Sequence, residues 1–148
     1  MDKYTDYVKK FDTFAREKFR DYERAQSAYE RAERASQRYP INNDLGVSIQ
    51  YQLEAQRRDI EYQQEAFKWK DTQYKFKEKT LEEAKAIRSE LIETIKKDLR
   101  ISWEDAEEYE SVQMIDELIE TLTECINDTS MISYWGQLTK SIITRIEV

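Results

Sequence analysis

The chain has 148 residues and a mass of 17.9 kDa, which suits one small domain or a long helical hairpin with a smaller bundle. Two glycines and one proline are too few for the turns of a sheet protein of this size, so sheet folds are excluded and a helical chain is expected. Charged residues make up 37% and the net charge is -7, but aromatic residues make up 12% and recur at helical spacing, which disordered chains lack.

The sequence contains no segment that predicts export or membrane insertion. The first residues have no apolar core of the kind a signal peptide needs, and no run approaches the roughly 20 apolar residues that cross a bilayer. The single Cys125 cannot form an internal disulfide and lies on an apolar helical face, which predicts a buried structural thiol. We therefore expect a soluble, cytoplasmic protein.

The first predicted helix covers residues 3 to 39. Its apolar residues follow one another at steps of three and four, except where Lys18, with Phe19 beside it, and a serine before Tyr39 interrupt the row. They alternate large rings with alanine, a pattern that favours close antiparallel packing of two helices. These residues are Tyr4, Val8, Phe11, Ala15, Tyr22, Ala25, Tyr29, Ala32 and Tyr39. Pro40 ends the helix, and the following INNDLG predicts a turn at about 40–46.

The second predicted helix carries two apolar rows. One row is Leu53, Ile60, Phe67, Tyr74 and Leu81; the other is Ala55, Tyr62, Trp69 and Phe76. Because the rows differ by two positions, they lie about 160° apart on the helix, and the lysines between them occupy the flanks. Helix one can cover only one row. The C-terminal helices, a second copy of the chain or a partner must cover the other, and the sequence does not say which row that is.

The remaining elements are also predicted to be helices. Thr80-Leu-Glu-Glu83 has the form of a capping box, at which the second helix could pause and restart to about Arg100; the sequence does not say whether the helix is continuous through Thr80. Ser102 begins a helix to about Asn127, and a last helix begins at about Ser130. The predicted fold is all-α: a long antiparallel, coiled-coil-like hairpin (residues 1–79) followed by a compact acidic bundle of about three shorter helices (residues 80–148).

The sequence lacks the residues that several common kinds of catalytic site require. The chain has no histidine, one cysteine and no glycine-rich phosphate loop, which removes the commonest general base, thiolate metal sites and nucleotide-binding loops. We expect a protein that is not an enzyme, with no catalytic residue, cofactor or metal.

Two similar heptapeptides, SELIETI and DELIETL, keep one enzymatic alternative open. They contain the carboxylate pairs Glu90 with Glu93 and Glu117 with Glu120. This arrangement resembles that of all-helical nucleotide pyrophosphohydrolases, which use Glu-x-x-Glu followed by Glu-x-x-Asp, although the second pair here ends in glutamate. The resemblance implies Mg²⁺ binding and nucleotide hydrolysis, as a remote alternative.

The acidic residues concentrate toward the C-terminus. Residues 1–100 have a charge balance of +2 and residues 101–148 a balance of -9, and no lysine or arginine occurs between Ile101 and Thr139. Five carboxylates fall opposite the apolar face of the helix predicted from Ser102: Glu110, Glu117, Glu120, Glu124 and Asp128. Their spacing of about 6 Å approaches that of successive phosphates, so this acidic face is either a solvated surface or a site for a basic partner.

The lysine-rich stretch 66–79 allows a second surface. Tyr62, Trp69 and Phe76 form an aromatic row with Lys70 and Lys77 on its flank, and rings beside lysines can stack nucleic-acid bases. The lysines stand on both flanks and the protein is acidic, so lysine stems that border a packed seam are favoured over nucleic-acid binding. If this row is exposed, it favours association with a protein partner or a second copy.

These patterns lead to one functional hypothesis with alternatives. The chain is expected to be a protein–protein interaction module, most specifically a small acidic inhibitor or adaptor of the phage or mobile-element type that occupies a basic, nucleic-acid-binding surface of an enzyme. One alternative is a structural coiled-coil protein that associates with itself, for example as a homodimer. Another is a protein that binds nucleic acid through the lysines and aromatic rings of residues 66–79.

Overall fold

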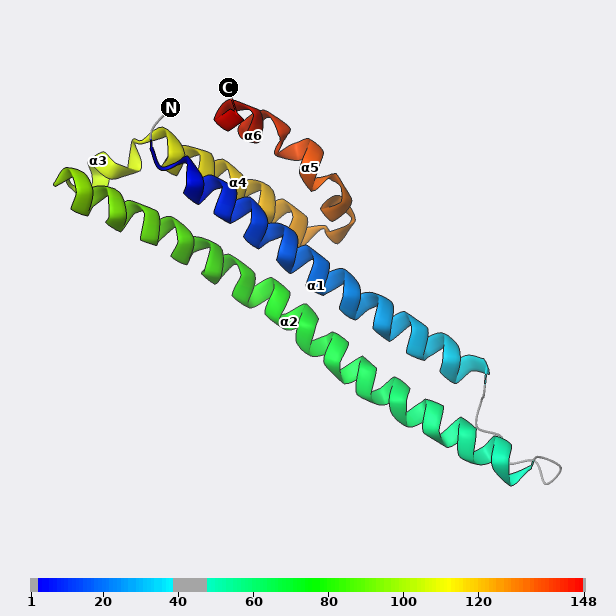
Figure 1. The fold of residues 1–148 in the computed structure, drawn as a ribbon. Coiled ribbons are helices and arrows are strands. Elements are labelled where there is room, and N and C mark those ends of the chain that lie inside the picture. Colours follow the sequence, from blue (N-terminus) through cyan, green and yellow to red (C-terminus); the bar gives the residue numbers. More distant parts are fainter. Residues whose placement is uncertain (1–2, 39–47, 148) are drawn as a thin grey trace. The chain divides into compact units, whose positions relative to one another are not determined.

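The computed structural model describes residues 3–38 and 48–147. Within these ranges every regular element is a helix and there is no strand, which confirms the predicted all-α hairpin with shorter helices (Figure 1). The predicted turn at 40–46, including Pro40, lies outside the described residues.

The first helix, α1 (Thr5–Arg38), buries the first part of the stripe that the sequence predicts, whereas Ala25, Tyr29 and Ala32 are half-buried and Tyr39 lies outside the described residues. Val8, Phe11 and Ala15 are fully buried, and Tyr4 and Phe19 nearly so. Steps of three and four residues return to the same side of a helix, so these residues form a continuous contact face.

The second helix, α2 (Ile49–Leu99), is continuous through Thr80, which answers a question that the sequence left open. Thr80 is 2% exposed and lies within the helix. No glycine or proline occurs between residues 49 and 99, so nothing interrupts the backbone ladder, and a capping sequence inside such a run does not start a new helix. The helix ends at Leu99, and Arg100 follows in the left-handed conformation (φ 54°) that commonly terminates helices.

The helix predicted from Ser102 to Asn127 is two helices, α3 (Trp103–Glu107) and α4 (Glu110–Asn127). Ser102 caps α3 as predicted, since its Oγ accepts a hydrogen bond from the Asp105 N–H at 3.1 Å. Tyr109 has an extended backbone and interrupts the helix. Ala106 and Val112 are both fully buried, although on one straight helix they would be about 120° apart, so the interruption turns both inward.

The C-terminal segment also consists of several short helices instead of the single helix that was predicted. A 3-10 helix, η1 (Thr129–Tyr134), precedes α5 (Trp135–Leu138) and α6 (Lys140–Glu147), where one helix was expected. The Asp128 carboxylate accepts hydrogen bonds from the backbone and hydroxyl of Ser130, which fixes the start of η1.

The chain divides into two compact units. Unit 1 is Met1–Phe19 with Phe76–Val148, and unit 2 is Arg20–Lys75. The predicted parts, 1–79 and 80–148, divide the chain differently, because the first half of α1 belongs with the C-terminal helices. Both long helices contribute to both units.

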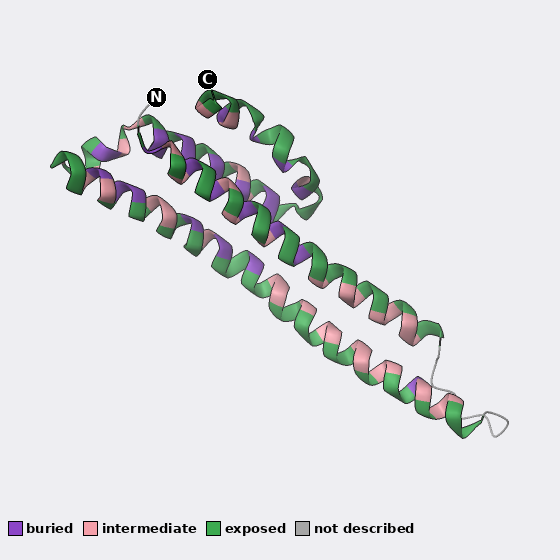
Figure 2. Cartoon of the chain, viewed as in Figure 1, coloured by how far each residue is buried: buried purple, intermediate pink, exposed green. Residues whose placement is uncertain are grey.

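Unit 1 contains most of the buried residues (Figure 2). Its core joins α1, the second half of α2, α4 and Trp135, and its largest fully buried aliphatic side chains are Leu91, Ile92, Ile95, Ile115, Leu118 and Leu122. In unit 2 the only described residues that are buried are Tyr22 and Ala55. Unit 2 is therefore a pair of antiparallel helix segments with little core of its own.

Candidate interaction surfaces

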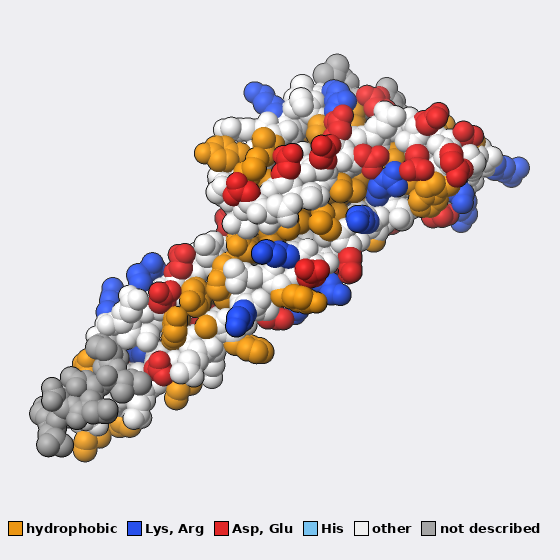
Figure 3. All heavy atoms as spheres, turned by 180° about the vertical axis from the view of Figure 1, so that it is seen from behind, with side chains coloured by type: hydrophobic (Ala, Val, Ile, Leu, Met, Phe, Trp, Pro, Cys, Tyr) orange, Lys and Arg blue, Asp and Glu red, His pale blue; other side chains and the backbone are white. Residues whose placement is uncertain are grey.

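The acidic face of α4 lies at the surface of unit 1. All five predicted carboxylates, Glu110, Glu117, Glu120, Glu124 and Asp128, are exposed. Figure 3 shows acidic side chains gathered over the part of the molecule that contains α4. The prediction that these residues share one exposed face is confirmed, whereas their binding of a partner stays a prediction.

Two of these five carboxylates have partners inside the chain. Arg145 of α6 donates to Glu117 at 2.5 Å, and Asp128 accepts from Ser130. Within the described ranges, Glu110, Glu120, Glu124 and Asp128 make no ion pair, so Arg145 neutralises only one of the five carboxylates, Glu117.

Arg88 of α2 also reaches the acidic segment. Its guanidinium donates to Glu107 at 2.6 Å and to Asp116 at 2.5 Å, and these hydrogen bonds raise its pKa. Arg88 and Arg145 both lie outside the segment from Ile101 to Thr139, so the charges along that segment alone do not reveal either arginine. Placing the arginines of the other predicted helices opposite this acidic face could have anticipated the two ion-pair partners.

The aromatic row of α2 contacts α1. In unit 2 the ring of Tyr22 lies 4.9 Å from that of Trp69, and Tyr29 lies 5.7 Å from Tyr62. In unit 1 Phe76, 5% exposed, contacts Phe19 with the ring centroids 6.2 Å apart. The aromatic row could be an association surface only if it were exposed. Because α1 covers the row, this condition is not met.

A hydrogen bond lies within this seam. The hydroxyl oxygens of Tyr29 and Tyr62 are 3.2 Å apart. This hydrogen bond, with burial, raises the pKa of Tyr29 to about 12. The contact holds the two helix segments of unit 2 together through a polar group as well as through ring packing.

The other row of α2 is exposed from Leu53 to Tyr74, whereas its last predicted member, Leu81, is half-buried. The remaining side chains lie between 56% and 77% exposed, with Phe67 at the upper limit. This exposed apolar row consists of Ile49, Leu53, Ile60, Phe67 and Tyr74. Figure 3 shows separate hydrophobic side chains along the outer edge of α2. The structure thus answers the question that the sequence left open: α1 covers the aromatic row, and the heptad row that begins at Leu53 is uncovered.

Polar side chains flank the exposed apolar row on both sides. Three residues after each heptad position stand Gln56, Gln63, Lys70 and Lys77, and four residues after stand Arg57, Gln64, Asp71 and Glu78. All eight are exposed. Lys70 and Lys77 make no ion pair with any described residue. Ile60, Gln63, Gln64 and Phe67 line a shallow depression at the middle of the row.

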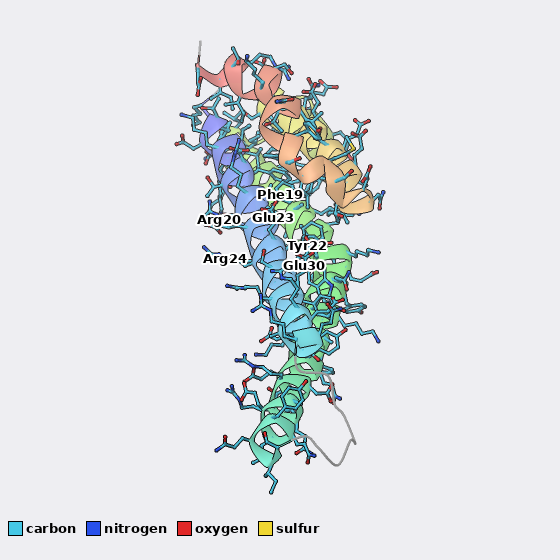
Figure 4. The ribbon with its side chains drawn as sticks, turned by 90° about the vertical axis from the view of Figure 1, so that its right-hand side faces the viewer. Phe19, Arg20, Tyr22, Glu23, Arg24 and Glu30 are labelled. Carbon is cyan, nitrogen blue, oxygen red and sulfur yellow. The ribbon has the colours of Figure 1, made fainter. Side chains whose placement is uncertain are left out.

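A row of arginines on α1 belongs to neither candidate surface, the acidic face of α4 or the exposed apolar row of α2. Its members are Arg20, Arg24, Arg31 and Arg34, which line one shallow depression together with Glu23 and Glu30. The side chains of Arg20 and Arg24 project away from the helices in Figure 4. Their spacing at multiples of about one helical turn is visible in the sequence, and a helical-wheel reading of the charges would have found it.

The carboxylate pairs that suggested Mg²⁺ binding have other neighbours. Lys10 contacts Glu90 at 3.4 Å, Lys96 contacts Glu93 at 3.8 Å and Arg145 contacts Glu117. In the described part of the chain, no three acidic, histidine or cysteine side chains are grouped so that they could hold a metal ion. The structure therefore does not bring the two pairs together as a metal site.

Cys125 is buried, as predicted. Its Sγ donates a weak hydrogen bond to the Met131 carbonyl at 3.7 Å. Burial, followed by the nearby Glu124 and Asp128 carboxylates, raises the pKa of the thiol to about 11, so the thiol is protonated at neutral pH.

The comparisons with known proteins give no match. No family model, curated protein or solved structure is similar to this chain. Among the described helices, none combines the length and the apolar character needed to cross a membrane.

Proposed function

We propose that this protein is a non-enzymatic protein–protein interaction module that binds a helical partner along the exposed apolar row of α2. The observation that carries the proposal is the uncovered row itself: five large apolar side chains lie on one face of α2, each more than half exposed. Single apolar residues are common on protein surfaces, but five that recur along one face of a helix are more typical of an interaction site.

The spacing of the row indicates the kind of partner. Leu53, Ile60, Phe67 and Tyr74 repeat every seven residues, the repeat with which helices wind around one another in a left-handed supercoil. A helix that follows this row meets an apolar side chain at each repeat. Lysine and arginine stems beside the row add apolar contact while their charges stay in water.

The proposal is tested by binding from a nuclease-treated lysate of the source, with the tagged intact chain as bait. Ile60→Ser with Phe67→Ser removes the centre of the row, and we expect it to lose partners that the native chain retains. Arg24→Ser with Arg31→Ser, also exposed in unit 2 but on α1, is the matched control and should retain them. Equal retention by both double variants would contradict the proposal.

A second candidate is the small acidic inhibitor or adaptor that masks a basic, nucleic-acid-binding surface. The observation in its favour is that Glu110, Glu120 and Glu124 are exposed and make no ion pair within the described ranges. In the same experiment, Glu110→Gln with Glu120→Gln and Glu124→Gln should release a salt-sensitive partner. The exposed carboxylates Glu23 and Glu30 of α1 supply a control, since their change to glutamine leaves α4 intact.

A further inference from the structure

We infer that the exposed apolar row of α2 binds the same row of a second copy of this chain, with the two α2 helices antiparallel. This inference rests on the proposed function and names its partner. The first support is the small core of unit 2, in which the buried described residues are Tyr22 and Ala55. Two helix segments that leave five large apolar side chains in water gain most by covering them.

The order of side chains along the row favours an antiparallel copy. Its first heptad positions are aliphatic, Leu53 and Ile60, and its last two are aromatic, Phe67 and Tyr74. In an antiparallel pair centred between Ile60 and Phe67, every layer contains one aliphatic side chain and one ring. A parallel pair would stack two rings in some layers and two aliphatic side chains in others, and so could not keep one helix separation as easily.

The charges on the flanks agree with this orientation. In an antiparallel pair each flank meets the same flank of the other copy. Arg57, which pairs with Glu54 and Glu61 of its own helix, then comes opposite Asp71 of the second copy, which pairs with Lys75, so the contact extends existing ion pairs, twice by symmetry. In a parallel coiled coil, each core residue faces the same residue of the other copy. If the flank with Lys70 formed the second core row, Lys70 would face Lys70; if the flank with Asp71 formed it, Asp71 would face Asp71. Like charges in such positions oppose association.

The centre of the antiparallel pair is self-complementary. Gln63 and Gln64 lie on either flank at the middle of the row, and each would come close to its own symmetry mate. A glutamine amide both donates and accepts hydrogen bonds, so two copies can satisfy each other. Lys70 and Lys77 come opposite Gln56 and Ile49 of the second copy, where no like charge stands.

Disulfide cross-linking of the intact chain tests the orientation. Gln63→Cys and Gln56→Cys change the same residue type on the same exposed flank, and neither removes an apolar side chain of the row. In the antiparallel pair residue 63 lies near its symmetry mate, whereas residues 56 of the two copies lie about 21 Å apart along the helix, too far for a disulfide. The native chain is the background control because its only cysteine is buried.

The expected result, under mild oxidation, is a disulfide-linked dimer of Gln63→Cys with little from Gln56→Cys or the native chain. Equal dimer yields from both variants would overturn the antiparallel orientation. No dimer from either variant, together with a monomeric native chain at the same concentration, would overturn the inference as a whole. The proposed function would then still depend on its own test, in which Ile60→Ser with Phe67→Ser either does or does not lose a foreign partner.

Discussion

Arg88 joins three helices through one guanidinium, since α2 supplies the arginine and α3 and α4 supply its carboxylate partners. Its side chain is 22% exposed, so these charge-assisted hydrogen bonds are partly shielded from water. Arg88→Met would leave Glu107 and Asp116 without their shared cation. We predict a loss of about 1–2 kcal/mol in the free energy of unfolding, measured by urea denaturation.

Arg145→Met is the matched control for Arg88. Arg145 also pairs with a carboxylate across helices, but its side chain is 43% exposed. We expect a loss of no more than about 0.5 kcal/mol, because exposed ion pairs contribute little. Equal losses for the two variants would show that the bridge from Arg88 has no special role in unit 1.

Tyr29 is expected to make unit 2 sensitive to alkaline pH. The hydrogen bond with Tyr62, then burial, raises the pKa of Tyr29 to about 12 from an ordinary value of 10.0. A raised pKa means that the folded state holds the proton more tightly, so the resulting stabilisation is complete below pH 10.0 and is lost as pH rises toward 12.

The titration of Tyr29 can be followed by ultraviolet absorbance, as the difference between the native chain and Tyr29→Phe. In a Tyr62→Phe background the same difference should titrate at lower pH, because the hydrogen bond is gone while the ring packing remains. An unchanged titration would show that the hydroxyl contact does not determine the raised pKa.

The two apolar rows of α2 show how far the sequence predicts the fold. Heptad spacing fixes which residues share a face, and the structure confirms both rows. It does not decide which row α1 covers, because both rows combine apolar and aromatic residues at the same repeat. That choice depends on contacts such as Tyr22 with Trp69, which join residues far apart in the chain.

Phe76 and Phe67 allow a prediction at the scale of this helix. The two residues have the same side chain, but Phe76 is 5% exposed against α1 and Phe67 is 77% exposed. Phe76→Ala should lower the free energy of unfolding by about 3–4 kcal/mol, as for other buried phenylalanines. Phe67→Ala should change it by less than about 0.5 kcal/mol, if unfolding is measured at protein concentrations too low for association.

Urea denaturation followed by tryptophan fluorescence measures both substitutions. Similar losses for both would mean that Phe67 is covered within a single chain, contrary to its exposure here. No loss for Phe76→Ala would mean that the aromatic row does not pack on α1.

The interruptions of the C-terminal helices were beyond local sequence reasoning. Ser102 is a recognisable cap, and the start of α3 follows it, but Tyr109 carries no turn signal. Its ring makes an edge contact with Tyr4, with the ring centroids 6.4 Å apart, and a contact between residues so far apart in the chain leaves no local sequence signal. The same reason explains the unforeseen pairing of Glu117 with Arg145.

At the scale of the whole molecule, the two candidate surfaces belong to different units. Residues 20–75 contain ten basic and ten acidic side chains, so the net charge of -7 resides on unit 1, which carries the acidic face of α4. The exposed apolar row lies entirely in unit 2. Substitutions at one surface should therefore leave the other intact, and salt should weaken binding through α4 more than association through α2.

Sedimentation equilibrium of the intact chain, over a wide range of concentrations and at moderate salt, tests most directly whether the exposed row of α2 joins two copies. We predict a reversible monomer–dimer equilibrium for the native protein and a monomer for Ile60→Ser with Phe67→Ser at every concentration. Arg24→Ser with Arg31→Ser should dimerise like the native chain. A native protein that remains monomeric throughout, or a row variant that dimerises as well as the native chain, would contradict this assignment.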